Sequence, residues 1–254
     1  MAAKLPAQRR SALRDPQAGA LPDVRQMDTH GDPSTPAIRS GSAFAGRWGA
    51  DENGCNTFPN STMNFLGHLL VSGNAPLVIV GNFMADAVKG RDLSGWSADL
   101  QTGIRMHRRI DSFTDNHPLT LKGRERLRPH CGKYAGVALD LFYDHAIASR
   151  WDLLNDEPLP DFTRRMYTLL KRHAHLMPDR TQQMLPYMVK NDWLTSYASI
   201  HGIARALRGL ASRVPAGGSL IGAEEVLQAH YAEFQKECLL FLPELEDHLA
   251  LPDA

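Results

Sequence analysis

Hydrophobic residues recur every three or four positions through most of this chain, and alternating strand patterns are almost absent. The longest regular stretch covers residues 134–154, where Val137, Leu141 and Trp151 fall on one helical face together with Asp144. Other helices are expected over residues 64–71, 76–90, from 97 to a break at 117–118, from 118 onward, and over 162–173, 192–212 and 224–242, with a short final helix restarting at 243. The pattern predicts a single all-α domain without internal repeats.

Residues 1–62 show no such period. They contain six prolines, six glycines and only ten large apolar residues, too few to offset the entropy of ordering the segment. We therefore predict a disordered N-terminal tail over residues 1–62 and a helical domain over residues 63–254. Because the patterned region opens on Met63, we also hypothesise that translation starts at this methionine.

Composition mainly excludes classes of function. Of the 254 residues, 28 are Lys or Arg and 28 are Asp or Glu, so the formal net charge is zero and no overall field steers the protein toward nucleic acid or anionic lipid. No stretch approaches the roughly 18 to 20 apolar residues of a membrane span. Cys55, Cys131 and Cys238 form no C-x-x-C pair, which argues against a disulfide framework or a structural zinc module. We expect a cytoplasmic protein with no nucleic-acid or membrane partner. The sequence does not indicate whether the protein is a monomer or an oligomer.

Ionisable residues on apolar helical faces are the informative anomaly, because burying them unpaired costs several kcal/mol. His107 and Asp111 are four residues apart, a spacing that places both side chains on one helical face about 6 Å apart. Such a pair can offer an imidazole and a carboxylate to one divalent cation. The alternative is a simple His–Asp ion pair within the helix.

Three other predicted helices carry similar groups: His68 on the first, Asn82 and Asp86 on the second, and Asp140, Asp144 and the adjacent His145 on the helix over 134–154. Each group alone has an alternative reading as a satisfied polar residue of the core. The presence of such groups on four successive helices is explained more economically by a common cation that gathers and neutralises the ligands. Mixed imidazole and carboxylate donors without a thiolate favour Mn²⁺, Mg²⁺ or Fe²⁺ over a structural zinc.

Arginines flank this candidate metal site. Arg105, Arg108 and Arg109 surround the His107–Asp111 face, and a metal beside guanidinium groups suits phosphate esters. The alternative for these arginines is a solvated helix face. Asp115 and Asn116 follow directly and are candidates for outer hydrogen bonds to the ligands or for a helix cap. A structural or pocket role is open for His230 on the late helix.

Several motifs resemble the bacterial acyl carrier protein phosphodiesterase family, also called acyl carrier protein hydrolase. The resemblance runs from Met63 to the C-terminus and rests on the motifs MNFLGHL at 63–69, GNFMAD at 81–86, GIRMHRRID at 103–111, TDN at 114–116, LDxxxDH at 139–145 and AHY at 229–231. It implies an all-helical fold distantly similar to HD-type metal phosphohydrolases, with Mn²⁺ as the cofactor. The implied reaction hydrolyses the phosphodiester between 4′-phosphopantetheine and a serine of acyl carrier protein, which gives the apo carrier and free 4′-phosphopantetheine.

The adjacent pair reads Asp144-His145 where the general HD signature reads His then Asp, so we assign roles from local geometry. We expect the metal ligands to be His107, Asp111, Asp86, Asp144 and His68. We expect Asp140 or His145 to orient or deprotonate the attacking water, and His145 to protonate the leaving serine. Arg108 or Arg109 would stabilise charge on phosphorus. The expected outer residues are Asn82, Asp115, Asn116 and His230.

An acyl carrier protein is a small acidic helical partner, so a neutral chain needs a local basic patch to bind it. The candidates are Arg105 to Arg109 and a second group formed by Arg164, Arg165, Lys171 and Arg172, for which a solvated helix face is the alternative. Two other functions compete. One is an HD-type nucleotide phosphohydrolase that acts on a guanosine polyphosphate, and the other is a non-catalytic carrier-protein-binding module whose His and Asp residues form an ion-pair network.

Overall fold

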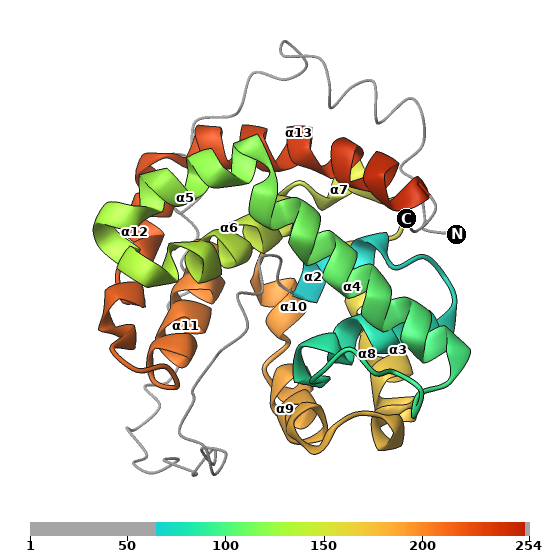
Figure 1. The fold of residues 1–254 in the computed structure, drawn as a ribbon. Helices are drawn as coiled ribbons and strands as arrows, with labels where there is room; N and C mark the ends of the chain where they lie inside the picture. Colours follow the sequence, from blue (N-terminus) through green and yellow to red (C-terminus); the bar gives the residue numbers. More distant parts are fainter. Residues whose placement is uncertain (1–64, 252–254) are drawn as a thin grey trace.

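The computed structural model describes residues 65–251, and every regular element in that range is a helix (Figure 1). The α-helices are α2 (Phe65–Val71), α3 (Pro76–Met84), α4 (Ala98–Asn116), α5 (Pro118–Cys131), α6 (Ala135–Ser149), α7 (Trp151–Leu154), α8 (Leu159–Arg172), α9 (Asp179–Lys190), α10 (Trp193–Ser196), α11 (Ile200–Ala211), α12 (Ala223–Ala229) and α13 (Tyr231–Ala250). Short 3₁₀ turns are η2 (Ala85–Ala87), η3 (Gly132–Tyr134), η4 (Ala174–Leu176) and η5 (Gly217–Leu220). The all-α prediction is confirmed. The predicted tail over residues 1–62 and the Met63 start lie outside the described residues.

Helix α6 is the centre of the domain. Twelve of its fifteen residues are buried, because α2, α5, α11 and α13 all pack against it. In Figure 1, the long helix α13 runs beside α5 over one side of the domain, and α3, α8 and α9 lie toward the other end. Since α6 is covered on almost every side, the polar residues that it carries must find partners inside the protein.

Helices α3 and α4 cross at backbone contact. A Cβ atom on Gly103 of α4 would lie 2.1 Å from the carbonyl oxygen of Val78, and one on Gly81 of α3 would lie 2.3 Å from the carbonyl oxygen of Leu100. Neither position tolerates a side chain without a backbone shift. The two glycines therefore allow a close approach that brings the polar end of α3 against the polar face of α4.

Several predicted helices are interrupted or extended in the structure. The stretch over 134–154 breaks at Arg150 between α6 and α7, and the stretch over 224–242 breaks at His230 between α12 and α13. The stretch over 192–212 divides into α10 and α11, where the Ser199 side chain caps α11 by accepting from the Gly202 amide. Pro243 does not restart a helix but lies buried inside α13, because the apolar face of α13 packs on the core and outweighs one lost hydrogen bond.

The second predicted helix ends earlier than expected. The structure also contains one helix, α9, that the sequence pattern does not predict. Helix α3 stops at Met84, and Asp86 lies on the 3₁₀ turn η2. Helix α9 carries Pro186 in its interior and a polar composition, which obscured its helical period. Within residues 65–251, no helix combines the length and the apolar character needed to cross a bilayer.

Candidate metal centre

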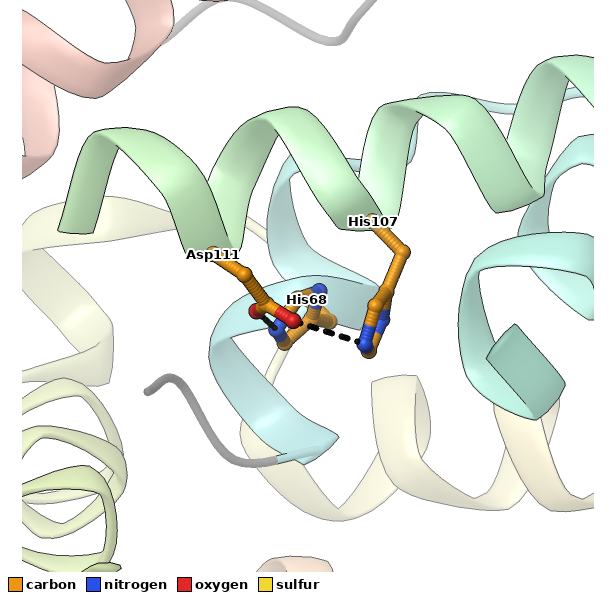
Figure 2. A group of neighbouring side chains, drawn as sticks. All are labelled: His68, His107 and Asp111. Carbon is orange, nitrogen blue, oxygen red and sulfur yellow. Dashed lines mark ion pairs between the residues drawn. The ribbon is translucent and has the colours of Figure 1, made fainter. Parts of the chain in front are cut away.

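Two buried histidines from different helices stack beside one aspartate (Figure 2). The rings of His68 on α2 and His107 on α4 lie with centroids 4.2 Å apart and planes inclined by 23°. The Nε2 atom of His68 is 3.3 Å from Oδ1 of Asp111, and the Nε2 atom of His107 is 3.2 Å from Oδ2 of the same carboxylate. One ligand atom from each of the three side chains lies within 4.8 Å of the others. The predicted convergence of His107 and Asp111 on one face, joined by His68, is present in the structure.

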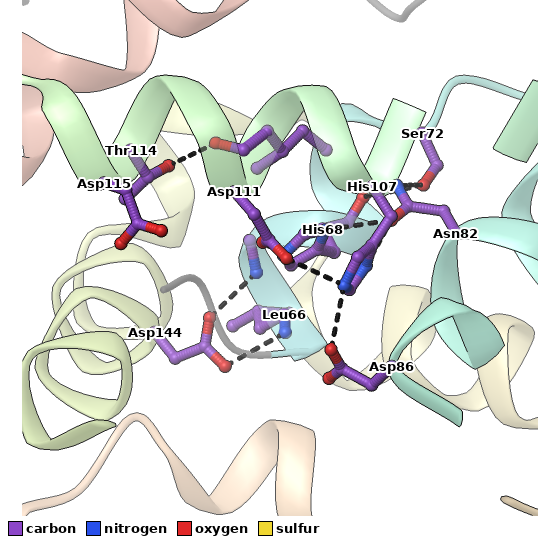
Figure 3. A network of polar contacts seen from close by, with 12 residues as sticks. Leu66, His68, Ser72, Asn82, Asp86, His107, Asp111, Thr114, Asp115 and Asp144 are labelled. Carbon is purple, nitrogen blue, oxygen red and sulfur yellow. Dashed lines mark hydrogen bonds and ion pairs between the residues drawn. The ribbon is translucent and has the colours of Figure 1, made fainter. Parts of the chain in front are cut away.

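Asn82 fixes the tautomer of both histidines (Figure 3). Its Oδ1 atom lies 2.9 Å from Nδ1 of His68 and 3.2 Å from Nδ1 of His107. Its amide nitrogen donates to the His68 carbonyl oxygen and to Oγ of Ser72, so the amide oxygen must be the atom that faces the rings. Each Nδ1 therefore carries a proton and donates to Asn82, which leaves both Nε2 atoms directed at Asp111.

This arrangement fits a divalent cation. A neutral imidazole presents a lone pair at Nε2, and a lone pair cannot face a carboxylate oxygen at 3.2 Å without a proton or a cation between them. Two imidazole nitrogens and a carboxylate, oriented by an outer hydrogen bond, are a typical donor set for Mn²⁺ or Fe²⁺. The donor chemistry of the described residues is thus compatible with a bound divalent cation.

Asp86 supplies a further carboxylate oxygen beside His107. Its Oδ1 atom is 3.1 Å from Nε2 of His107, and its side chain is 38% exposed, whereas that of His107 is 6% exposed. The structure therefore gathers His68, His107 and Asp111 in one cluster, and Asp86 contacts this cluster through His107 from the solvent side.

The charges in the cluster stabilise one another. Burial lowers the pKa of His107, but hydrogen bonds and charge attraction from Asp111 and Asp86 outweigh burial and raise this pKa to about 10. Burial raises the pKa of Asp111, but hydrogen bonds to His107 and His68 hold it well below the usual range. Without a metal, a proton on the imidazole occupies the place that a cation would take.

Asp144 anchors the helix that carries His68, in place of the predicted ligand role. Its Oδ2 and Oδ1 atoms accept the backbone N–H groups of Leu66 and Gly67, at 3.0 and 2.8 Å (Figure 3). Burial raises the pKa of Asp144 to about 7, against the lowering effect of these two hydrogen bonds. Both carboxylate oxygens are thus committed to the first amides of α2, where a negative group is favoured.

Asp140 lies one helical turn before Asp144 and is 5% exposed. Its Oδ1 atom has no hydrogen-bond partner among the described residues. Burial raises the pKa of Asp140 well above the usual range, and the charges of Asp111 and Asp144 add to this effect while Arg124 opposes it. A raised pKa favours the protonated carboxyl, which donates a hydrogen bond or a proton, so the direction of this shift is more consistent with a donor than with the predicted base.

His145 contacts a different set of groups from Asp144, its neighbour in sequence. Its Nδ1 atom donates to the Tyr197 carbonyl oxygen at 2.7 Å, and its Nε2 atom lies 3.2 Å from the Tyr231 hydroxyl. Burial lowers the pKa of His145, against a hydrogen bond to Tyr197 that raises it. Both ring nitrogens are already engaged, so the structure does not support the predicted proton transfer by His145.

The two arginines predicted to face the phosphate bind backbone carbonyls instead. Arg108 donates to the carbonyl oxygens of Val88 and Gly90. Arg109 donates to the carbonyl oxygens of His248 and Leu251 at the C-terminus of α13, where a cation stabilises the helix end. In this structure each guanidinium holds a chain segment in place.

Of the four predicted outer residues, only Asn82 contacts the cluster. Asp115 forms an ion pair with Arg124, and the Asn116 side chain donates to the carbonyl oxygen of Ser112 in its own helix. His230 lies at the α12–α13 junction, 42% exposed, with Nδ1 3.4 Å from Glu233. The prediction for these three residues rests on proximity in sequence or on a shared helical face. In the structure, long-range packing places their side chains against other partners.

The two predicted basic patches differ in their acidic neighbours. Arg105 is exposed on α4 and donates to the Gln101 side chain. Arg164 is paired with Asp161, and Arg165 with Glu157, while Lys171 and Arg172 are exposed at the end of α8. Part of the second patch is therefore neutralised within the protein.

The fold and the cluster define an all-α protein with a buried site of two histidines and carboxylates. A sequence model of the family "Acyl carrier protein phosphodiesterase" matches residues 63–245, and the chain belongs to this family. It is 35% identical over 182 residues to the acyl carrier protein phosphodiesterase of Photorhabdus laumondii, covering 71% of this chain and 92% of that protein. It is 34% identical over 182 residues to that of Yersinia enterocolitica, covering 71% and 94%. No solved structure gives a significant match. The relatives are named as enzymes, and this chain is an enzyme of the same family.

Proposed function

We propose that this protein is a metal-dependent phosphodiesterase that removes 4′-phosphopantetheine from a serine of acyl carrier protein. The products are the apo carrier and free 4′-phosphopantetheine. The family supports the substrate, and one observation carries the metal dependence: a single Asn82 oxygen orients two histidines so that both Nε2 atoms meet the Asp111 carboxylate. We place this reaction in the cytoplasm, beside fatty acid biosynthesis.

We assign two roles to the residues of the site, the binding of a cation and the donation of a hydrogen bond or a proton. His68, His107, Asp111 and Asp86 would hold the ion, for which Mn²⁺ is our first choice and Mg²⁺ or Fe²⁺ the alternatives. A bound ion would supply Lewis acidity toward a phosphoryl oxygen and a water of lowered pKa. Asp140, whose pKa is raised by burial, would donate a hydrogen bond or a proton.

Mass spectrometry of the carrier tests the reaction directly. Purified protein is incubated with holo-acyl carrier protein and Mn²⁺, and we expect the carrier to lose the mass of 4′-phosphopantetheine. EDTA in excess should stop the loss, and added Mn²⁺ should restore it, because the proposed reaction needs a cation bound by the clustered ligands. Loss of mass at full rate in EDTA would contradict the metal dependence. Phosphate release from guanosine polyphosphates without action on the carrier, or complex formation without loss, would contradict the proposed substrate or the catalysis.

The carrier would dock beside the exposed edge of the site. Arg91 and Arg105 are exposed and lie near Asp86 in sequence or on the adjoining face of α4. Arg164 and Arg165, by contrast, form ion pairs with Asp161 and Glu157. An acidic partner is attracted to such a rim through charges that salt screens over about 10 Å at 0.1 M.

We expect Arg105→Glu to raise KM for holo-acyl carrier protein several-fold at low salt while kcat stays close to the wild-type value. The difference from the wild type should shrink as NaCl is raised. Arg128→Glu on α5, which also reverses one exposed arginine, is the matched control. Steady-state kinetics at two salt concentrations measures both effects, and equal increases in KM for the two variants would argue against a localised docking edge.

A further inference from the structure

One of the four proposed metal ligands lies on a short turn, whereas the other three lie on α-helices. His68, His107 and Asp111 lie on α-helices, but Asp86 lies on the three-residue turn η2 at the protein surface. Beyond this turn the chain has no regular helix until Ala98. Two backbone hydrogen bonds define the turn, from the Ala85 amide to the Asn82 carbonyl oxygen and from the Val88 amide to the Ala85 carbonyl oxygen.

Arg108 holds the segment that follows Asp86. Its Nη2 atom lies 2.7 Å from the Gly90 carbonyl oxygen and 3.3 Å from the Val88 carbonyl oxygen. Gly90 has a φ of +81°, a conformation that favours glycine, and it turns this segment back toward α4. Because Arg108 is adjacent to His107, neighbouring residues of α4 contact both the Asp86 carboxylate and the backbone just beyond it.

We propose that Arg108 is a positioning residue that holds Asp86 against His107. It would act by fixing the chain from Val88 to Gly90 through charge-assisted hydrogen bonds, not by touching the phosphate. The consequence for metal binding rests on the proposed function, because it requires that Asp86 is a ligand. The attachment of the 85–91 segment to α4 does not depend on the metal.

The positioning role and the charge-stabilising role predicted from sequence have different consequences. A guanidinium that stabilises charge on phosphorus affects kcat and leaves metal affinity unchanged. A guanidinium that positions a ligand affects metal affinity, and its loss loosens the 85–91 segment in the metal-free protein. Removal of an outer residue of this kind weakens metal affinity about 10-fold to 100-fold.

The test compares Arg108→Ala and Arg108→Lys with Arg105→Ala. Arg105 is the matched control for segment order and metal affinity, because it is a cation one turn earlier on α4 whose guanidinium, within residues 65–251, donates to the Gln101 side chain of its own helix. In metal-free protein, hydrogen exchange of the amides in 85–91 should become about tenfold faster in Arg108→Ala and remain at the wild-type rate in Arg105→Ala. Mn²⁺ affinity, measured by electron paramagnetic resonance of the free ion, should fall about tenfold in Arg108→Ala. Arg108→Lys should fall between the two.

A double variant shows whether Arg108 acts through Asp86. If it does, adding Arg108→Ala to Asp86→Ala should not weaken Mn²⁺ binding beyond the Asp86→Ala value. Additive losses would overturn the proposal. So would wild-type exchange in 85–91 and wild-type Mn²⁺ affinity in Arg108→Ala, whether kcat falls or not. If the wild-type protein binds no Mn²⁺, the proposed metal dependence fails, and the exchange measurement still decides whether Arg108 holds the segment.

Discussion

Gly103→Ala is expected to lower the stability of the domain by about 3 kcal/mol or more, at the upper end of overpacking effects. The new Cβ atom would lie 2.1 Å from the Val78 carbonyl oxygen, 2.7 Å from the Asn82 backbone nitrogen and 2.9 Å from the Gly81 Cα. All three are backbone atoms, so no side-chain rotation relieves the contact. Helices α3 and α4 would have to move apart.

Thermal and urea unfolding measure this effect. For a domain of this size, a loss of about 3 kcal/mol lowers Tm by about 10 °C. Gly95→Ala is the control, since a Cβ atom at this glycine meets nothing within 4 Å and should leave Tm nearly unchanged. Because α3 carries Asn82 and α4 carries His107, Gly103→Ala should also weaken Mn²⁺ binding at temperatures where the protein remains folded. A wild-type Tm in Gly103→Ala would show that the helices do not cross at backbone contact.

The parts of the site that follow from spacing within one helix could be predicted from the sequence. His107 and Asp111 must share a face at four residues apart, whatever packs against their helix. The stacking of His68 on His107 could be expected only from the unusual number of polar groups on apolar helices. Its geometry, with one Asn82 oxygen between two rings, depends on how three helices pack.

Long-range packing also determines the features of the site that could not be predicted from the sequence. Asp144 and His145 are neighbours on a helix that is buried on almost every side, so they point to different partners, and a sequence pattern cannot say which side faces the cluster. The acceptors of Arg108 and Arg109 are carbonyl groups left by a turn and by a helix end, and these exist only after folding. Glycine inside a helix indicates a cost in propensity, and only the structure shows that Gly81 and Gly103 permit the α3–α4 crossing.

His107→Ala is expected to lower kcat/KM for holo-acyl carrier protein at least about a thousandfold, which corresponds to about 4 kcal/mol of lost transition-state stabilisation. The imidazole contacts Asn82, Asp86 and Asp111 at once. Without it, Asp86 and Asp111 both lose their contact with His107, and the site has one fewer ligand to hold a cation. The effect on Mn²⁺ affinity should therefore be large as well.

Far-ultraviolet circular dichroism and activity, measured on the same preparation, separate catalysis from folding. Alanine favours helices and α4 keeps its contacts with α3 and α13, so the helical spectrum of His107→Ala should stay close to that of the wild type. His175→Ala, which removes an exposed histidine on η4, is the control and should retain full turnover. If His107→Ala kept near-wild-type turnover with Mn²⁺ supplied, His107 could not be a metal ligand, and the cluster would have to be interpreted as an ion-pair network.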